Sequence, residues 1–217
     1  MNLEQIREYI PFILEGITVT LQYTFAAAIV GFIWGTILAL FKISSMKPLK
    51  WFAVAYTSIF RGTPLILQLM IAYNAIPQLT GYQISPFQAA LLAFGLNSAA
   101  YISETIRAGI MAIDKGQIEA AMSLGIPYSR MMIHIVLPQA MKNILPALVN
   151  ESIALLKESA LVSTIGVMDL LRRADYVGAK TYLYFEPYLI AGMIYYVLVM
   201  ALTGVAKLLE RRLRRSD

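Results

Sequence analysis

The sequence predicts an all-α membrane protein with about five transmembrane helices and a cytoplasmic polar helix. Hydrophobic residues make up 59% of its 217 residues and charged residues only 14%, which is more apolar than an ordinary soluble domain. The apolar residues occur in contiguous runs, and a helix needs about 20 such residues to cross a bilayer. Lys and Arg number 18 against 13 Asp and Glu, an excess that in membrane proteins reflects topology rather than nucleic-acid binding. Residues 1–217 are predicted to form one transmembrane domain in a lipid bilayer.

Basic residues set the predicted orientation. The first span is predicted at residues 18–41 and is followed by Lys42, Lys47 and Lys50. Because basic residues concentrate in cytoplasmic loops, this loop is placed inside and the N-terminus outside. The C-terminal segment 210–217 carries four arginines and is placed inside as well.

The second span is predicted at residues 63–77, after an interfacial elbow helix at 49–61. A charge on Arg61 would be costly at mid-membrane, and Pro64 disfavours helix at the residue before it. Both observations place the break between elbow and span near Arg61. Residues 77–87 contain two prolines, one glycine and no charge, which predicts a short external turn.

Three further spans complete the predicted topology, at residues 88–113, 137–156 and 184–209. Residues 159–171 are too few to cross comfortably, so a re-entrant or surface helix is expected there. Five spans leave the N-terminus outside and the C-terminus inside. The basic residues between 172 and 180 then fall outside, against the positive-inside tendency.

A polar island at residues 117–138, QIEAAMSLGIPYSRMMIHIVLP, separates two of the apolar runs. Residues 117–125 contain good helix formers, with Gly125 able to end the helix and Pro127 just beyond. This segment is too short and too polar to span, which predicts a short helix at the cytoplasmic surface. Taken alone, the EAA and glycine pattern fits an ordinary loop helix equally well.

The longer pattern resembles the EAA loop of importer permeases in the ATP-binding-cassette (ABC) superfamily. It comprises Glu119, Ala120, Ala121 and Gly125, followed by IVLP at residues 135–138. The resemblance implies that this loop is the coupling helix that docks into a groove of the ATPase subunit. In this interpretation the alanines permit close approach, and Gly125 turns the chain back.

Three other segments resemble the polar amino acid uptake family of these permeases. They are FRGTPLILQL at 60–69, NSAAYISETIRAGI at 97–110 and LLKESALVSTIG at 155–166. Glu158 departs from the family pattern, in which this position is often neutral. Together with the EAA loop, the matches cover residues 56–167.

The resemblance implies the type I ABC importer fold, a prokaryotic inner (plasma) membrane and several partners. These are two ATPase subunits, a second permease copy or a related chain, and an extracytoplasmic amino acid binding protein. The ATPase subunit would bind ATP and Mg²⁺, and this chain would hold no cofactor.

Polar residues at helical spacing mark a candidate substrate path, since ionisable groups within spans are costly and by default indicate a pathway or a partner. If the stripes on the third and fourth spans converge, they form a negatively charged cavity. That cavity favours a cationic amino acid such as arginine, lysine or histidine. The residues are Asn97, Tyr101 and Glu104 on the third span and Glu151, Leu155 and Glu158 on the fourth.

The competing interpretation of these acids is structural. Glu104 would pair with Arg107, one turn further along the same helix. Glu158 would pair with Lys157 or Arg61. In that case the carboxylates serve the fold and gating rather than the substrate.

No pattern in the sequence predicts catalysis or a metal site. The chain has one histidine, His134, and no cysteine, so a histidine or thiolate metal site is not expected. It has no GxxxxGK[ST] phosphate loop, so energy would come from a partner. The prediction is therefore a transport subunit and not an enzyme. An ATP-independent secondary carrier or a cation channel remains open, because a channel also uses a negative cavity.

Overall fold

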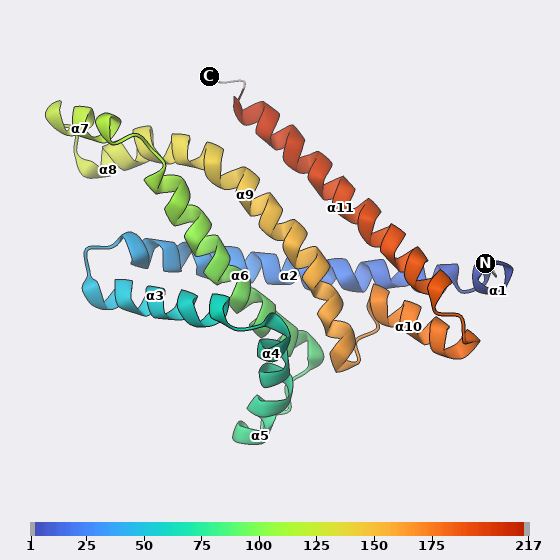
Figure 1. The fold of residues 1–217 in the computed structure, drawn as a ribbon. Helices are drawn as coiled ribbons and strands as arrows, with labels where there is room; N and C mark the ends of the chain where they lie inside the picture. The colour runs from blue at the N-terminus through green and yellow to red at the C-terminus, as the bar shows by residue number, and fades with distance from the viewer. Residues whose placement is uncertain (1–2, 215–217) are drawn as a thin grey trace.

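The computed structural model describes residues 3–214, which form a bundle of helices with no strand in that range (Figure 1). Four long helices build the bundle: α2 (Ile10–Ile43), α6 (Pro86–Met111), α9 (Leu137–Glu158) and α11 (Phe185–Arg214). The shorter helices are α1 (Leu3–Arg7), α3 (Lys47–Gly62), α4 (Leu65–Met70), α5 (Ile76–Thr80), α7 (Lys115–Ser123), α8 (Tyr128–Met131) and α10 (Leu170–Thr181). Two π-helical segments (Ile71–Ala75 and Met132–Val136) and a 3₁₀ helix (Ser159–Ile165) connect them.

Several short helices gather at opposite ends of the bundle. Figure 1 shows α1, α10 and the start of α11 at one end, and α7, α8 and the link between α2 and α3 at the other. This grouping agrees with the predicted assignment of segments to two sides. Which end faces the cytoplasm stays a prediction.

Three helical segments are long and apolar enough to cross a membrane, at residues 10–43, 128–165 and 185–212. The pair α3 and α4–α5, bent by 101°, counts as a fourth if it forms one broken span. α6 has 26 residues but is not among these segments. The predicted total of five spans therefore requires α6 to cross as well, and it stays a prediction.

Helix extends beyond the predicted end of the second span and also precedes the predicted start of the fourth span. The second span continues as helix to Thr80, beyond its predicted end at Pro77. α9 begins at Leu137, where the fourth span is predicted to start, but α8 and a π-helical segment lead into it from Tyr128, so that Pro138 lies within continuous helix. A proline inside an α-helix clashes with the carbonyl four residues earlier. In both places a π-helical segment precedes the proline, and its wider turn accommodates the ring.

Glycines allow α2 to approach its neighbours closely. A Cβ atom at Gly31 would lie 2.8 Å from the Ser98 hydroxyl of α6, and one at Gly35 would lie 2.9 Å from the Ala99 carbonyl. Small residues at helix contacts permit this backbone approach within membranes. α2 and α6 consequently share the most extensive helix contact in the described part of the chain.

Residues 159–171 form a 3₁₀ helix and a turn at Gly166, and the regular helix α10 begins only at Leu170. The helix expected at 159–171 thus lies further along the chain. Asp169 caps α10 by accepting a hydrogen bond from the Arg172 amide at 2.8 Å.

Two of the three basic residues predicted to lie outside, Arg173 and Lys180, have partners in the first part of the chain. Arg173 Nη1 lies 2.6 Å from a Glu15 carboxylate oxygen and donates to the Phe12 carbonyl at 2.9 Å. The Lys180 ammonium lies 5.0 Å from the centroid of the Tyr9 ring. If this end lies outside as predicted, specific pairing of these cations accounts for their departure from the positive-inside tendency.

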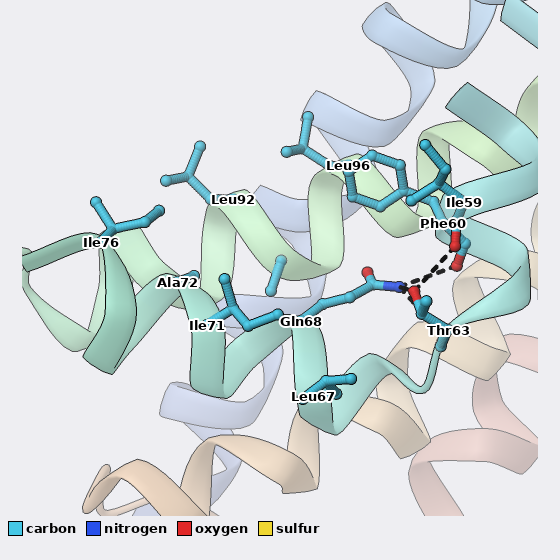
Figure 2. A pocket seen from close by; sticks show the side chains of 11 residues that line it. Ile59, Phe60, Thr63, Leu67, Gln68, Ile71, Ala72, Ile76, Leu92 and Leu96 are labelled. Carbon is cyan, nitrogen blue, oxygen red and sulfur yellow. Dashed lines mark hydrogen bonds between the residues drawn. The ribbon is translucent and has the colours of Figure 1, made fainter. Parts of the chain in front are cut away.

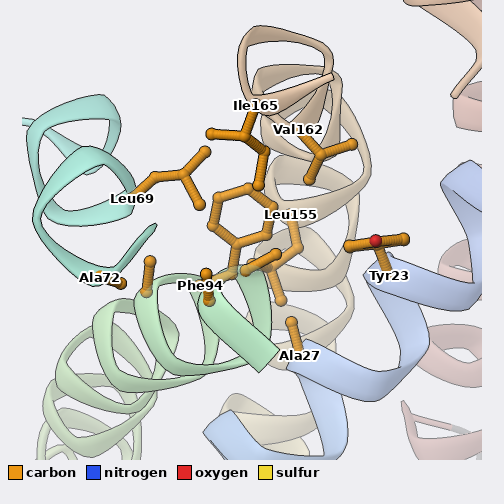
Figure 3. Close-up of a cluster of buried hydrophobic side chains, with 11 residues drawn as sticks. Tyr23, Ala27, Leu69, Ala72, Phe94, Leu155, Val162 and Ile165 are labelled. Atoms are coloured by element: carbon orange, nitrogen blue, oxygen red, sulfur yellow. The ribbon is translucent and has the colours of Figure 1, made fainter. Parts of the chain in front are cut away.

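The largest hydrophobic cluster surrounds Phe94 of α6 and includes Tyr23 and Ala27 of α2 (Figure 3). Leu69 comes from α4, Leu155 from α9, and Val162 from the 3₁₀ helix. These side chains fix the C-terminal part of α9 against α6 and α4.

Single cysteines in this cysteine-free chain should report the topology. Ser44 and Ser123 should label only from the cytoplasm, and Ser85 only from outside, because they lie in the segments between the predicted spans. Membrane-impermeant maleimide, applied to intact cells and to inverted vesicles, measures the accessible side. Labelling of position 85 from the cytoplasm alone would contradict the five-span map.

Candidate functional site

The break between α3 and α4 is held together by two side-chain amides. Gln68 Nε2 donates to the Phe60 carbonyl and the Thr63 hydroxyl, each at 2.9 Å (Figure 2). Asn97 Nδ2 donates to the same Phe60 carbonyl at 2.9 Å and to Gln68 Oε1 at 3.1 Å. Asn97, a predicted substrate contact, is thus buried and engaged with the elbow.

A cavity of about 360 Å³ lies beside this amide pair (Figure 2). Its walls are mainly aliphatic side chains from α3, α4 and α6, with Gln68 and Thr63 contributing polar atoms. A charged or zwitterionic ligand would lose its hydration there with few polar groups to replace it. The cavity is therefore a poor site for a polar amino acid.

Glu104 bridges two basic residues. Its Oε1 lies 2.5 Å from Lys42 Nζ of α2, and its Oε2 lies 2.8 Å from Arg107 Nη2. The Lys42 side chain is only 2% exposed and also donates to the Ser103 hydroxyl at 3.0 Å. The sequence predicted a pairing of Glu104 with Arg107 but not with Lys42. Lys42 lies 62 positions away on another helix, so residue spacing does not reveal it.

The neighbouring predicted residue, Tyr101, is half-exposed, and the Arg61 guanidinium lies 5.1 Å from its ring centroid. Arg61 therefore engages the aromatic face and forms no ion pair with Glu158 within residues 3–214. A substrate contact of Tyr101 stays a prediction.

The two acids of α9 are half-buried and differ in their contacts. Glu151 Oε1 accepts a hydrogen bond from Ser98 Oγ of α6 at 3.2 Å. Glu158 forms no hydrogen bond or ion pair with any other described residue, so the expected pairing with Lys157 does not occur. The third predicted residue of this stripe, Leu155, lies in the hydrophobic cluster with 2% exposure.

An exposed polar stripe runs along the same helix. Asn143, Asn150 and Lys157 are exposed and recur every seven residues, which places them on one face. A face with amides and an ammonium group is unfavourable against lipid tails. The stripe therefore favours contact with water or another protein chain. From the sequence, Lys157 was considered only as an ion-pair partner of Glu158. Its seven-residue spacing from Asn150 could have revealed the exposed polar stripe.

The polar island folds as predicted into a capped helix, α7. Asp114 begins it by accepting from the Gly116 amide at 2.7 Å. At the other end Gly125 adopts φ +69°, its amide donates to the Met122 carbonyl at 3.0 Å, and the Ile126 amide donates to the Ala121 carbonyl at 3.1 Å. This pair of bonds is the Schellman arrangement, which requires a left-handed residue.

The three residues of the EAA sequence point to different surroundings. Glu119 and Ala120 are exposed, whereas Ala121 is 3% exposed and packs in a cluster with Met131 and Val136. Ala121 therefore allows close approach to the chain's own next helix. Glu119 and Ala120 remain accessible to a partner.

Comparison with known proteins identifies the family. Residues 27–215 match the model described as binding-protein-dependent transport system inner membrane component. The arginine transport system permease protein ArtQ of Bacillus subtilis is 59% identical over 208 residues, covering 96% of this chain and 95% of ArtQ. A Rickettsia felis protein whose name provisionally assigns it to glutamine transport, GlnP, is 52% identical over 93% of each chain.

A solved structure shows the same fold along the whole chain. A crystal structure described as an amino acid ABC transporter with histidines superposes with a TM-score of 0.94 at 46% identity, covering 98% of this chain and 99% of that one. The resemblance predicted from the four sequence blocks is thereby confirmed. The match to ABC permeases also favours an ATP-driven transporter over a secondary carrier or cation channel. The chain belongs to the family of binding-protein-dependent transport system inner membrane components, the membrane-embedded permease subunits of ABC importers.

Proposed function

We propose that this chain is the permease subunit of an importer for cationic amino acids such as arginine, lysine and histidine. The observation that carries the proposal is the pair of half-buried acids, Glu151 and Glu158, on one face of α9. They are seven positions apart, about 10 Å along the helix axis. An extended basic amino acid can therefore reach from one carboxylate toward the other.

The chemistry of this face suits an amino acid at both ends. A guanidinium or ammonium group that leaves water regains stabilisation from charge-assisted hydrogen bonds, and Glu158 has no hydrogen-bonded partner in the described structure to compete for them. Every amino acid also carries a carboxylate, for which the exposed Lys157 ammonium is the adjacent counter-charge. Both carboxylate oxygens of Glu104 are already paired, which supports a structural role for that residue.

The named relatives support an amino acid substrate and differ in its charge. ArtQ is named for arginine, and the solved neighbour is described with histidines. The provisional name of GlnP, for glutamine, makes a neutral polar amino acid the second candidate. Two carboxylates on the proposed path favour the cationic one.

The complex is proposed to contain two ATPase subunits, a second permease copy or related chain, and an external binding protein. The exposed stripe of Asn143, Asn150 and Lys157 supports a facing permease across a water-filled path. In this proposal ATP and Mg²⁺ bind to the ATPase subunits, and this chain acts as the transport subunit. The match to inner membrane components supports assembly of this complex in a prokaryotic inner membrane.

A continuous helical path links the proposed ATPase contact to the proposed substrate contact. α7 packs through Ala121 on α8, which continues without a break through the π-helical segment into α9. From Tyr128 to Glu158 this helix is about 45 Å long. Displacement of α7 by the ATPase subunits would therefore move Glu151 and Glu158 as parts of the same rigid element.

Replacing Glu158 with glutamine tests the substrate assignment. Loss of a buried charged contact typically costs about 2 to 5 kcal/mol, so the concentration of arginine for half-maximal stimulation of ATP hydrolysis should rise more than about tenfold. Basal hydrolysis should change far less. Glu8→Gln, the same chemical change at an exposed residue of the N-terminal segment, is the matched control. Equal stimulation of wild type and Glu158→Gln by arginine and lysine would argue against the cationic substrate.

A further inference from the structure

We infer that a basic recess beside α7 receives an acidic side chain of the ATPase subunit. This inference rests on the proposed function, in which an ATPase subunit docks at α7. The recess has a volume of about 430 Å³ and is lined by the turn at residues 124–127 and by Arg130, His134 and Ile135. Figure 1 shows α7 and α8, which flank the turn that lines the recess, together at one end of the bundle.

The positive charge of the recess is not neutralised within the described chain. Arg130 and His134 are both exposed, and neither forms a hydrogen bond or ion pair with another residue between 3 and 214. Arginine is permanently charged and presents several N–H donors, and a histidine ring adds another donor. A carboxylate is the complementary group.

The backbone around the recess is held in place before any partner binds. The left-handed Gly125 and its two turn hydrogen bonds fix residues 124–127. Met131, next to Arg130, is 1% exposed and anchors α8 in the bundle. A preorganised site loses less conformational freedom on binding than a flexible loop does.

Exposed apolar residues border the same recess. Leu124 is 79% exposed and Tyr128 68% exposed. Apolar contacts that exclude water around a charged pair strengthen that pair, and protein interfaces commonly have this arrangement. These neighbours favour a protein carboxylate as the occupant over a free anion in solution.

Charge reversal of Arg130 tests the inference in the assembled system. The permease is reconstituted in nanodiscs of phosphatidylcholine, and the dissociation constant of its ATPase subunit is measured at two salt concentrations. Arg130→Glu should raise this constant by about tenfold or more, and Arg130→Gln should also reduce its salt dependence. Arg212→Glu is the matched control, since it makes the same charge change at an exposed residue of α11.

Three results would overturn the inference. The first is an unchanged dissociation constant for Arg130→Glu. The second is an equal rise for Arg130→Glu and Arg212→Glu, which would indicate a net-charge effect. The third is a rise only in nanodiscs with phosphatidylglycerol, which would assign the recess to a lipid headgroup. Failure of the wild-type permease to bind the ATPase subunit at all would instead refute the proposed function.

Discussion

Gly125→Val should abolish most of the substrate-stimulated ATP hydrolysis while leaving the permease in the membrane. At φ +69° a residue with a side chain is strained by about 1 to 2 kcal/mol, and a β-branched residue by more. A Cβ atom there would meet no atom within 4 Å. The strain is therefore confined to the turn that ends α7, and the bundle packing is preserved.

The strain from Gly125→Val would break the turn, because its two hydrogen bonds require the left-handed conformation. Without them, residues 124–127 would no longer hold α7 in its orientation against α8. Gly125→Asn is the control, since asparagine tolerates this conformation better than other residues with a side chain. Hydrolysis by the purified complex, with and without its substrate-loaded binding protein, measures the coupling. Full stimulation in Gly125→Val would contradict a role for this turn.

Glu104→Gln should destabilise the permease by about 3 to 5 kcal/mol, and Lys42→Met by less. The asymmetry follows from the geometry of the pair. Glu104→Gln removes the counter-charge of the Lys42 ammonium, which is 2% exposed, and leaves it only neutral acceptors such as the Ser103 hydroxyl. Loss of Lys42 leaves Glu104 paired with Arg107.

A double-mutant cycle isolates this interaction. Lys42→Met combined with Glu104→Gln should be more stable than Glu104→Gln alone, because the unpaired buried cation is gone. Thermal unfolding of the purified permease in detergent, with the four proteins measured together, gives the coupling energy. Additive effects of the two substitutions would show that the ion pair between α2 and α6 does not stabilise the bundle.

The helical class, the elbow and the capped helix at the polar island were predictable from local patterns. The lengths of the apolar runs predicted the long helices. Pro64 predicted the end of the elbow helix, and Gly125 predicted the end of α7. These features depend on residues close together in the sequence, so periodicity and turn chemistry report them directly.

The features that could not be predicted from the sequence depend on tertiary packing. The helix through Pro138 survives because a π-helical segment accommodates the ring, a local rearrangement that no propensity indicates. Lys42 was placed in a loop, yet its ammonium is buried against Glu104 of α6. Spacing on one helix cannot reveal such a partner on another.

The same limit applied to the candidate site. Glu151, Leu155 and Glu158 recur at helical spacing, but Leu155 turns into the hydrophobic cluster with Phe94. Lys157, one position from Glu158, is exposed instead. The elements that pack against a helix decide which of its faces is buried in the core and which is exposed to lipid or water.

The most direct test of the central claim is ATP hydrolysis by the reconstituted complex of this permease, its ATPase subunit and its binding protein, screened over amino acids. The account predicts hydrolysis that depends on the permease and is stimulated most by arginine, lysine or histidine. Stimulation by glutamine alone would replace the cationic substrate with a neutral one. ATP hydrolysis that is unaffected by the permease and by every amino acid would contradict the account.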